Sequence, residues 1–345
     1  MIGRLSPATR STLVAGGLDP DGVVAVVGRA FTEDLPSWGT SGGDPSAGGP
    51  SVAGGASMSG GASVGSGSSV GSVDATSAAT VDAALVGHGA LVSRAAGTVA
   101  GLPVVAAVFE CLLGRAVTVT LLAEDGDAIK PGEAVATISG PVRGLLTAER
   151  TALNLLCHLS GIATLTRTWV DAVAGTGAAI RDTRKTLPGL RALEKYAVRQ
   201  GGGVNHRMSL TDAALIKDNH VVAAGGVAAA FAAVRARFPD LPVEVECDTV
   251  DQVVEAVEAG ADLILCDNMT LADLRACVAV ARPARVRLEA SGGLTLQVAA
   301  DVAATGVDYL AVGALTHSAP ALDLGLDLDP SRSGPAPVGS TAEES

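Results

Sequence analysis

Aromatic residues are scarce in this chain, since Phe, Trp and Tyr together make up 2% of its 345 residues. Hydrophobic residues still reach 48%, so Ala, Val and Leu must supply most of the core. A chain of this length is long enough for two domains, or for one large α/β domain with additions.

Long apolar runs are also missing. The longest Ala-rich run, residues 223–234, is too short to span a bilayer and is closed by Arg235. The first 17 residues lack the continuous apolar core of a signal peptide. We therefore expect a cytoplasmic protein.

The chain contains no CxxC motif. Its cysteines are spread through apolar stretches, at Cys111, Cys157, Cys247, Cys266 and Cys277. This pattern favours buried, reduced thiols of a cytosolic protein, with a metal cluster or a catalytic thiol as the alternatives.

The chain as a whole has no excess of positive charge, because its formal net charge is −12. This balance argues against nucleic acid as the main partner. Residues 181–220 differ, because they hold eight of the 24 Lys and Arg against four acids. A cationic pocket in an acidic protein indicates a small, highly anionic ligand, because the positive potential is focused there.

Residues 36–72 form a low-complexity segment in which 23 of 37 residues are Gly or Ser. So few apolar groups cannot offset the entropy lost on ordering. We expect a disordered, dispensable insert.

The pattern of hydrophobicity changes near residue 147. Residues 79–146 alternate in short β-rich segments between turns, whereas from 148 the apolar residues recur with a helical period. We expect a small strand-and-turn layer over 79–146, within an N-terminal domain over 1–147.

Beyond that boundary a strand–helix unit recurs. The expected strands are apolar and end in polar or Gly residues, and they lie within 178–186, 214–220, 243–249, 262–268, 286–293 and 308–314. Such repeats predict an α/β domain with a parallel sheet covered by helices. Six units favour a (β/α) barrel over an open sheet.

Helix boundaries in this region carry their own signals. Thr249 and Thr270 are N-cap candidates, followed three residues later by Gln252 and Asp273. Glycines at 260 and 306 stand where C-caps are expected.

In barrels of this kind, chemistry lies at the carboxyl ends of the strands. Read in order, those ends carry Arg184, Lys185, Lys217, Glu246, Asp267, Ser291, Gly292, Gly293 and Gly313. Ser-Gly-Gly before a helix offers free backbone N–H groups to a phosphate, although a plain turn would have the same sequence. The two carboxylates could hold ribose hydroxyls, steady a developing cation or share Mg²⁺, or they could be structural ion-pair partners.

The cations of 181–220 have several possible roles. Arg184, Lys185, Arg207 and Lys217 fit carboxylate or phosphate groups, with a solvated surface as the alternative. His206 lies next to Arg207 and is either a ligand contact or a core histidine. Three further cations lie on a helix-like segment and are expected mostly on its solvated face: Arg191, Lys195 and Arg199.

These residues together resemble the quinolinate phosphoribosyltransferase family. The resemblance is carried by residues 148–164, 182–220, 244–247, 265–268, 288–293 and 313–328. One departure is that DATS (74–77), which follows EDL closely in the family, lies here beyond the insert.

The resemblance implies an N-terminal α/β sandwich domain and an open, incomplete (β/α) barrel over 148–318. Residues 319–345 would return to the first domain and end in a disordered tail from about 330. The family also implies a homodimer or a hexamer, with Arg150 contributed across the interface.

The resemblance also implies a reaction. Quinolinate and 5-phosphoribosyl-1-pyrophosphate would give nicotinate mononucleotide, CO₂ and pyrophosphate with Mg²⁺, a step of NAD biosynthesis. The roles it implies by position are quinolinate binding for Arg150, Arg184, His206, Arg207 and Lys217; phosphate binding for Lys185, Ser291, Gly292, Gly293, Gly313 and His317; and metal and ribose binding for Glu246 and Asp267, with these two carboxylates, Lys185 and Lys217 as the catalytic set.

Two alternatives use the same fold. One is a homologue of the molybdenum-utilisation type that acts on another acid, and the other is a non-catalytic sensor of phosphate ligands. Four cations argue against the first alternative, because a ligand with two carboxylates needs several of them: Arg150, Arg184, Arg207 and Lys217. Glu246 and Asp267 argue against the second, because ligand binding alone requires neither.

Overall fold

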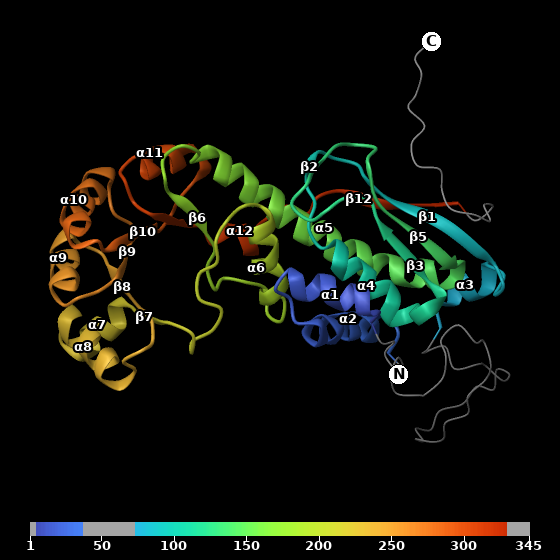
Figure 1. The fold of residues 1–345 in the computed structure, drawn as a ribbon, viewed down its shortest axis with the longest axis horizontal. Helices are drawn as coiled ribbons and strands as arrows, with labels where there is room; N and C mark the ends of the chain where they lie inside the picture. The colour runs from blue at the N-terminus through green and yellow to red at the C-terminus, as the bar shows by residue number, and fades with distance from the viewer. Residues whose placement is uncertain (1–4, 37–72, 330–345) are drawn as a thin grey trace, which may run out of the picture. The chain divides into compact units, whose positions relative to one another are not determined.

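The fold is described from a computed structural model of the chain, which describes residues 5–36 and 73–329 (Figure 1). Apart from Pro36, the predicted Gly/Ser insert lies outside the described residues, as does the predicted tail from 330. The chain divides into two compact units, one comprising Met1–His158 with Leu322–Ser345 and the other Leu159–Ala321.

Helix α5 runs through this division as one element, Val142–Ala172. The predicted boundary at 147 therefore falls inside a helix that begins earlier than expected. The division between His158 and Leu159 lies within α5, and the second division, at 321/322, lies close to the predicted 318/319.

The first unit contains a four-stranded antiparallel sheet in the order β12-β1-β5-β3, together with helices and a two-stranded ribbon of β2 and β4. Its strands are β1 Val86–Ser93, β2 Gly97–Thr98, β3 Thr118–Leu121, β4 Ala128–Ile129, β5 Ala134–Pro141 and β12 Leu324–Asp329. Its helices besides α5 are α1 Pro7–Ala15, α2 Pro20–Asp34, α3 Ala75–Thr80, α4 Leu102–Leu113 and the 3₁₀ turn Gly114–Ala116. Through β12, the C-terminal segment returns to this sheet.

Helix α4 corrects the prediction of a purely β-rich segment over 79–146. Its sequence, LPVVAAVFECLL, is buried along nearly its whole length. A helix that is apolar on every side shows no helical period in its hydrophobicity, so the pattern could not distinguish it from strands. Pro103 stands in its first turn, where a missing N–H costs nothing.

The second unit is a parallel sheet with helices outside it (Figure 1). Its strands are β6 Ala179–Arg181, β7 Ala214–Ile216, β8 Val243–Cys247, β9 Leu263–Asp267, β10 Arg287–Ser291 and β11 Tyr309–Ala311. Its helices are α6 Arg191–Gln200, α7 Asp218–Ala224, α8 Val227–Arg237, α9 Val250–Glu258, α10 Leu271–Ala281, α11 Ala299–Ala303 and α12 Ala314–His317, with 3₁₀ turns at Arg282–Ala284 and Leu296–Val298.

The strand order is β6-β11-β10-β9-β8-β7. This is the cyclic order of a barrel opened between its first two strands, β6 and β7. The predicted α/β fold with a parallel sheet and an N-terminal domain is confirmed, and the open, incomplete barrel stays a prediction.

The two faces of the sheet differ in chemistry. On β8, Val243, Val245 and Cys247 are buried on the face that α8 and α9 cover. Glu244 and Glu246 alternate with them, so both carboxylates lie on the opposite, inner face. The inner face of such a barrel is ordinarily filled by branched apolar side chains, so charged residues there need an explanation.

The predicted helix caps are confirmed. Thr249 with Gln252 forms a capping box at α9, and Thr270 with Asp273 forms one at α10. Gly260 and Gly306 adopt positive φ angles of 90° and 97° at the helix ends.

All five cysteines are free thiols, four of them buried and Cys157 partly exposed. In the described ranges, no single helix is both long and apolar enough to cross a membrane. The sharply bent pair α7–α8 passes that test by length and composition only.

Candidate active site

Two arginines near the carboxyl end of β6 and the 205–213 connection lack anionic partners. Arg184 and Arg207 each carry a buried Nε without a hydrogen-bond partner. Within the described part of the chain, neither guanidinium forms an ion pair, and Arg207 donates only to the Ala213 carbonyl, at 2.8 Å. Burial, and after it the nearby Arg184, lower the pKa of Arg207. Two cations that repel each other and hold unused donors form a site for an anion.

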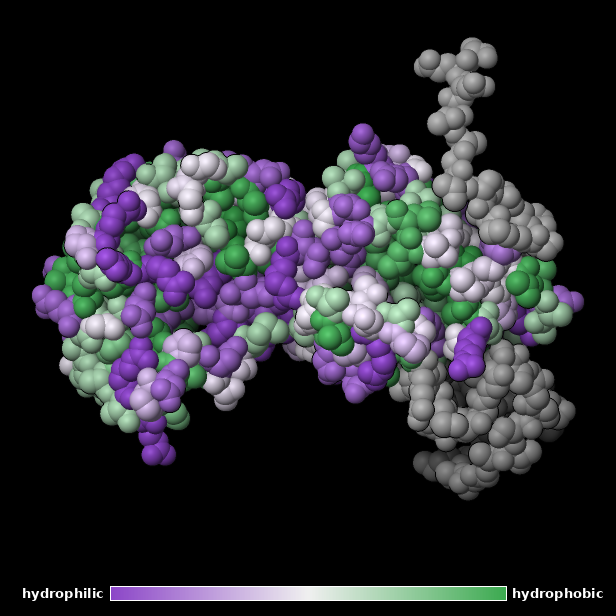
Figure 2. Space-filling view, viewed as in Figure 1, coloured by the Kyte–Doolittle hydropathy of each residue, from purple (hydrophilic) through white to green (hydrophobic). Residues whose placement is uncertain are grey.

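Hydrophilic residues gather over this part of the second unit, around the connection between β6 and β7 (Figure 2). Lys217, directly after β7, pairs with Glu246 on the neighbouring strand β8. The Lys217 side chain is 47% exposed and that of Glu246 is 12% exposed. The structure thus brings together two residues that were expected to face different substrates.

The next strands bring Asp267 and Ser291 side by side, because they are register partners at the ends of β9 and β10. Asn268 donates to Asp267 at 2.7 Å, and its backbone N–H donates to the Ser291 carbonyl at 3.0 Å. At Gly292, with φ +89°, a Cβ atom would lie 2.2 Å from Asn268 Oδ1. Only glycine allows these two turns to approach so closely.

The sequence suggested that Gly292 and Gly293 directly precede a helix, but in the structure they do not. Leu294 and Thr295 intervene before the 3₁₀ turn at Leu296–Val298, and α11 begins at Ala299. The backbone N–H groups of the Ser-Gly-Gly turn therefore have no helix dipole directly behind them.

A third group forms around Gly313. A Cβ atom at Gly313 would lie 2.9 Å from Lys185 Cδ, and 3.5 Å from both His317 Nε2 and Thr183 Oγ1. Lys185 is exposed, and its backbone is held by Thr183 and Thr316. The predicted phosphate-binding residues Lys185, Gly313 and His317 thus surround one point.

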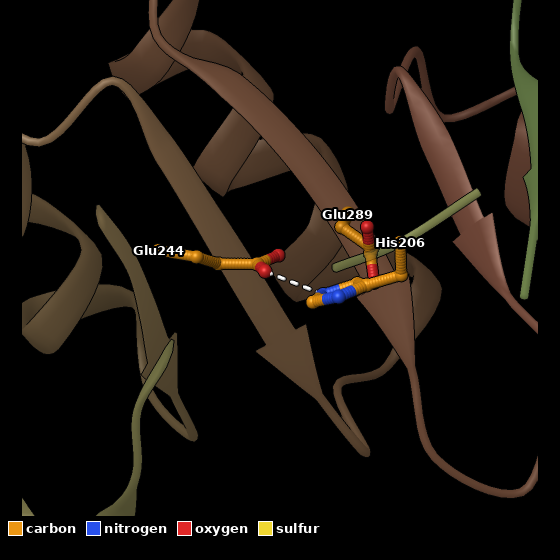
Figure 3. Close-up of side chains that lie close together, drawn as sticks. All are labelled: His206, Glu244 and Glu289. Carbon is orange, nitrogen blue, oxygen red and sulfur yellow. Dashed lines mark ion pairs between the residues drawn. The ribbon is translucent and has the colours of Figure 1, made fainter. Parts of the chain in front are cut away.

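His206 lies in a buried polar cluster that sequence reasoning missed (Figure 3). The carboxylates of Glu244 on β8 and Glu289 on β10 converge on its ring, with Nε2 2.6 Å from Glu244 Oε2 and 3.8 Å from Glu289 Oε1. Arg181 of β6 donates to Glu289 at 2.5 Å and stacks on Tyr309 at 4.8 Å. Burial, and after it the Glu244 carboxylate, raise the pKa of Glu289 to about 7.

The oxygens and Nε2 of His206, Glu244 and Glu289 lie within 4.8 Å of one another, close enough to hold a metal ion. The hydrogen bonds of the His206 ring argue against a metal ion. Its Nδ1 accepts the Arg207 backbone N–H at 2.7 Å, so the ring proton must be on Nε2. A protonated Nε2 donates to Glu244 and cannot ligate a metal.

Lys195 corrects the prediction of a solvated helix face. It is fully buried, pairs with Asp182 and donates to the His206 carbonyl at 2.9 Å. Burial raises the pKa of Asp182 and lowers that of Lys195, while their pairing opposes both shifts. Its helix neighbours Arg191 and Arg199 are partly exposed and exposed, respectively.

Arg150 belongs to the first unit, where it pairs with Glu149 at 2.8 Å and is 69% exposed. The structure brings the other predicted residues into local groups of the second unit. Alternation along VEVEC and RLEAS could have revealed Glu244 and Glu289, since each lies two residues before a predicted strand-end residue.

Two family models match the chain. "Quinolinate phosphoribosyl transferase, N-terminal domain" covers residues 74–160, and the C-terminal domain of the same family covers 162–327. Together they match residues of both units, from 74 onward.

Curated and solved relatives agree with the models. The Mycobacterium leprae "Nicotinate-nucleotide pyrophosphorylase [carboxylating]" is 55% identical over 240 residues, 69% of this chain and 84% of that protein. The human protein of that name is 41% identical over 250 residues, 71% and 83% of the two chains. The crystal structure of NadC from Streptococcus pyogenes has a TM-score of 0.77 at 36% identity, covering 90% of this chain and 98% of that one.

Proposed function

The chain belongs to the quinolinate phosphoribosyltransferase family, and we propose on that premise that it transfers a phosphoribosyl group to quinolinate with loss of CO₂. The donor is 5-phosphoribosyl-1-pyrophosphate, and the products are nicotinate mononucleotide, CO₂ and pyrophosphate. The reaction supplies NAD biosynthesis.

The observation that carries the proposal is the unpaired arginine pair. Quinolinate carries two adjacent carboxylates, and Arg184 and Arg207 offer two guanidiniums without anionic partners among the described residues. Binding a dianion removes their mutual repulsion and fills their unused donors. Lys217 supplies a third cation when the substrate competes for it with Glu246.

The donor substrate fits the remaining groups. Lys185 and His317, around Gly313, face the phosphates, while the Ser291–Gly292–Gly293 turn receives the 5-phosphate end. Both substrates are polyanions, so these cations also offset the repulsion between them.

Glu246 and Asp267 act on the ribose. As pyrophosphate departs, positive charge develops at the anomeric carbon, and the two carboxylates stabilise it. The pyridine nitrogen then attacks and becomes cationic. When the 2-carboxylate leaves as CO₂, the electron pair of the broken bond stays on ring carbon C2 beside the cationic nitrogen, and a proton from water then bonds to C2. No protein nucleophile takes part, so positioning supplies much of the acceleration.

Mg²⁺ fits the donor set at this point. Glu246 and Asp267 offer carboxylate oxygens, and they form no three-ligand cage with any other His, Cys, Asp or Glu that the structure describes. Mg²⁺ is commonly held by one or two carboxylates together with substrate phosphates and water. When bound, the ion would neutralise charge on the leaving pyrophosphate.

A homodimer or a hexamer completes the site in this proposal, with Arg150 reaching quinolinate bound to the partner subunit. Its support is the 69% exposed Arg150 side chain, whose one ion-pair partner in the described chain is the adjacent Glu149. The free thiols support a cytoplasmic location.

Substrate discrimination tests the proposal. Purified protein with Mg²⁺ and 5-phosphoribosyl-1-pyrophosphate should form nicotinate mononucleotide from quinolinate and none from nicotinate. Arg184→Gln should raise the KM for quinolinate about tenfold or more, since a hydrogen-bonded charge pair is worth roughly 1.5–3 kcal/mol. Turnover of nicotinate instead of quinolinate would contradict it.

A further inference from the structure

The buried cluster of Arg181, His206, Glu244 and Glu289 has no task in the mechanism above. Glu244 is 4% exposed and Glu289 is fully buried, and each keeps one oxygen without a hydrogen-bond partner. Burying a carboxylate with an unsatisfied oxygen destabilises a fold, and an apolar side chain of similar size could fill the same space. Glu244 therefore calls for a role other than packing.

His206 links this cluster to the arginine pair, and both of its ring nitrogens are occupied. Nδ1 accepts the backbone N–H of Arg207 at 2.7 Å, and Nε2 donates to Glu244 at 2.6 Å. The ring is 8% exposed. No ring nitrogen is left for a substrate, so His206 cannot contact quinolinate through either nitrogen while these bonds persist.

The segment that precedes Arg207 is held on its other side as well. Asp182 accepts the His206 backbone N–H at 2.8 Å, and Lys195 donates to the His206 carbonyl at 2.9 Å. Asn205 donates to the Lys195 carbonyl at 2.9 Å. These bonds hold the backbone at residues 205–206 from the side of β6 and α6. The His206 ring, bound to Glu244, holds it from the side of β8.

Arg207 needs such support. Among the described residues its guanidinium donates only to the Ala213 carbonyl, and its Nε has no partner there. Arg184 lies close enough to contribute to the lowered pKa of Arg207, so the two like charges repel each other. A ring that binds the Arg207 backbone N–H, and is itself bound by a carboxylate, limits the displacement that this repulsion would cause.

We propose that Glu244 is a positioning residue of the anion site, which holds the His206 ring and thereby sets Arg207 for a substrate carboxylate. The proposal rests on the function proposed above. Glu244 touches no substrate, and its hydrogen-bond acceptor, more than its charge, performs the task.

Replacement of Glu244 separates acceptor from charge. Glu244→Gln keeps an oxygen that accepts the Nε2 proton, so the KM for quinolinate should stay within about twofold of the wild type. Glu244→Leu removes the acceptor, so this KM should rise about tenfold, with the KM for 5-phosphoribosyl-1-pyrophosphate changed less than about twofold. Glu244→Met carries the same expectation if the Leu variant does not fold.

A double-mutant cycle tests whether Glu244 acts through the ring. His206→Phe keeps a ring without nitrogens and should raise the quinolinate KM as Glu244→Leu does. Adding Glu244→Leu to His206→Phe should then change it no further. The proposal would be overturned if the KM increases of His206→Phe and Glu244→Leu multiplied in the double variant. It would also be overturned if Glu244→Leu and Glu244→Met left the quinolinate KM unchanged.

Val245→Ala is the matched structural control, since Val245 is fully buried on the opposite face of the same strand. It should lower the melting temperature and leave the quinolinate KM unchanged. An equal KM rise in this variant would mean that Glu244 acts through stability alone. Failure of the wild type to turn over quinolinate would sink the proposed function, whereas a normal wild type with an indifferent Glu244 would sink only this inference.

Discussion

At the scale of single residues, the site depends on which polar groups are left unpaired. Arg184 and Arg207 keep unused donors near the carboxyl ends of the strands. Lys195 and Asp182 carry opposite charges and neutralise each other in the core. The same 40-residue segment thus holds arginines with unused donors as well as an internal lysine.

Glycine at 292 is a residue on which donor binding should depend. Its φ of +89° and the 2.2 Å approach of a Cβ to Asn268 exclude any side chain without movement of the turn. Gly292→Ala should raise the KM for 5-phosphoribosyl-1-pyrophosphate at least tenfold in steady-state assays. Gly260→Ala is the control, because Gly260 at the end of α9 has a similar φ of +90° and open space where its Cβ would lie; equal effects would contradict the assignment.

Glu289 should make stability depend on pH. Its folded-state pKa of about 7 lies above the usual 4.5, so the folded protein binds the proton more tightly than the unfolded chain. Its contribution is complete below about pH 4.5 and is lost as the pH rises through about 7. Arg181, His206 and Glu244 face it from the neighbouring elements.

Glu289→Gln mimics the protonated carboxyl at every pH. The melting temperature of this variant, relative to the wild type, should therefore increase from pH 5 to pH 8. A difference that stays constant across this range would show that Glu289 does not titrate there.

Sequence reasoning found the polar residues at the strand ends but missed the carboxylates that lie two residues earlier, inside the strands. Glu246 and Asp267 were recognised because each ends an apolar strand, and parallel strands end at one edge. Glu244 and Glu289 lie inside the strands, where the runs were read as apolar throughout. The partner of Lys195 is 13 residues away at Asp182, so no local pattern could reveal its burial.

At the scale of elements, short caps set where each helix of the second unit begins. At α10, Thr270 accepts the Asp273 backbone N–H at 3.2 Å, and the Asp273 carboxylate accepts from Thr270 in return. These signals lie within four residues of sequence, and for that reason they could be predicted. Helix α4 could not, because complete burial erases the periodicity that identifies a helix.

Thr270→Ala should lower the free energy of unfolding by about 1 kcal/mol, the usual value of an N-cap hydroxyl. Thr270→Ser keeps the acceptor and should match the wild type. Denaturant or thermal unfolding of the three proteins measures the difference, and equal stability of the Ala and Ser variants would exclude a capping role.

At the scale of the whole molecule, the proposed site draws on residues of two chains. Arg150 belongs to a different compact unit from Lys217, and the sequence placed both in one site only through the family resemblance. Neither composition nor periodicity carries information about an interface between subunits.

Mixing two inactive variants tests the shared site. Arg150→Ala and Lys217→Ala should each lose most activity, and hybrid dimers should regain some of it, because one of their two sites is intact. Labelled subunits would establish that exchange had occurred. Absence of recovery after demonstrated exchange would place Arg150 in its own subunit's chemistry or outside the site.

The stoichiometry of CO₂ release shows whether phosphoribosyl transfer by this protein is coupled to decarboxylation. With quinolinate labelled at the 2-carboxylate, the wild-type protein should release labelled CO₂, pyrophosphate and nicotinate mononucleotide in equal amounts, with no CO₂ when 5-phosphoribosyl-1-pyrophosphate is omitted. Formation of pyrophosphate or nucleotide without labelled CO₂ would contradict the account.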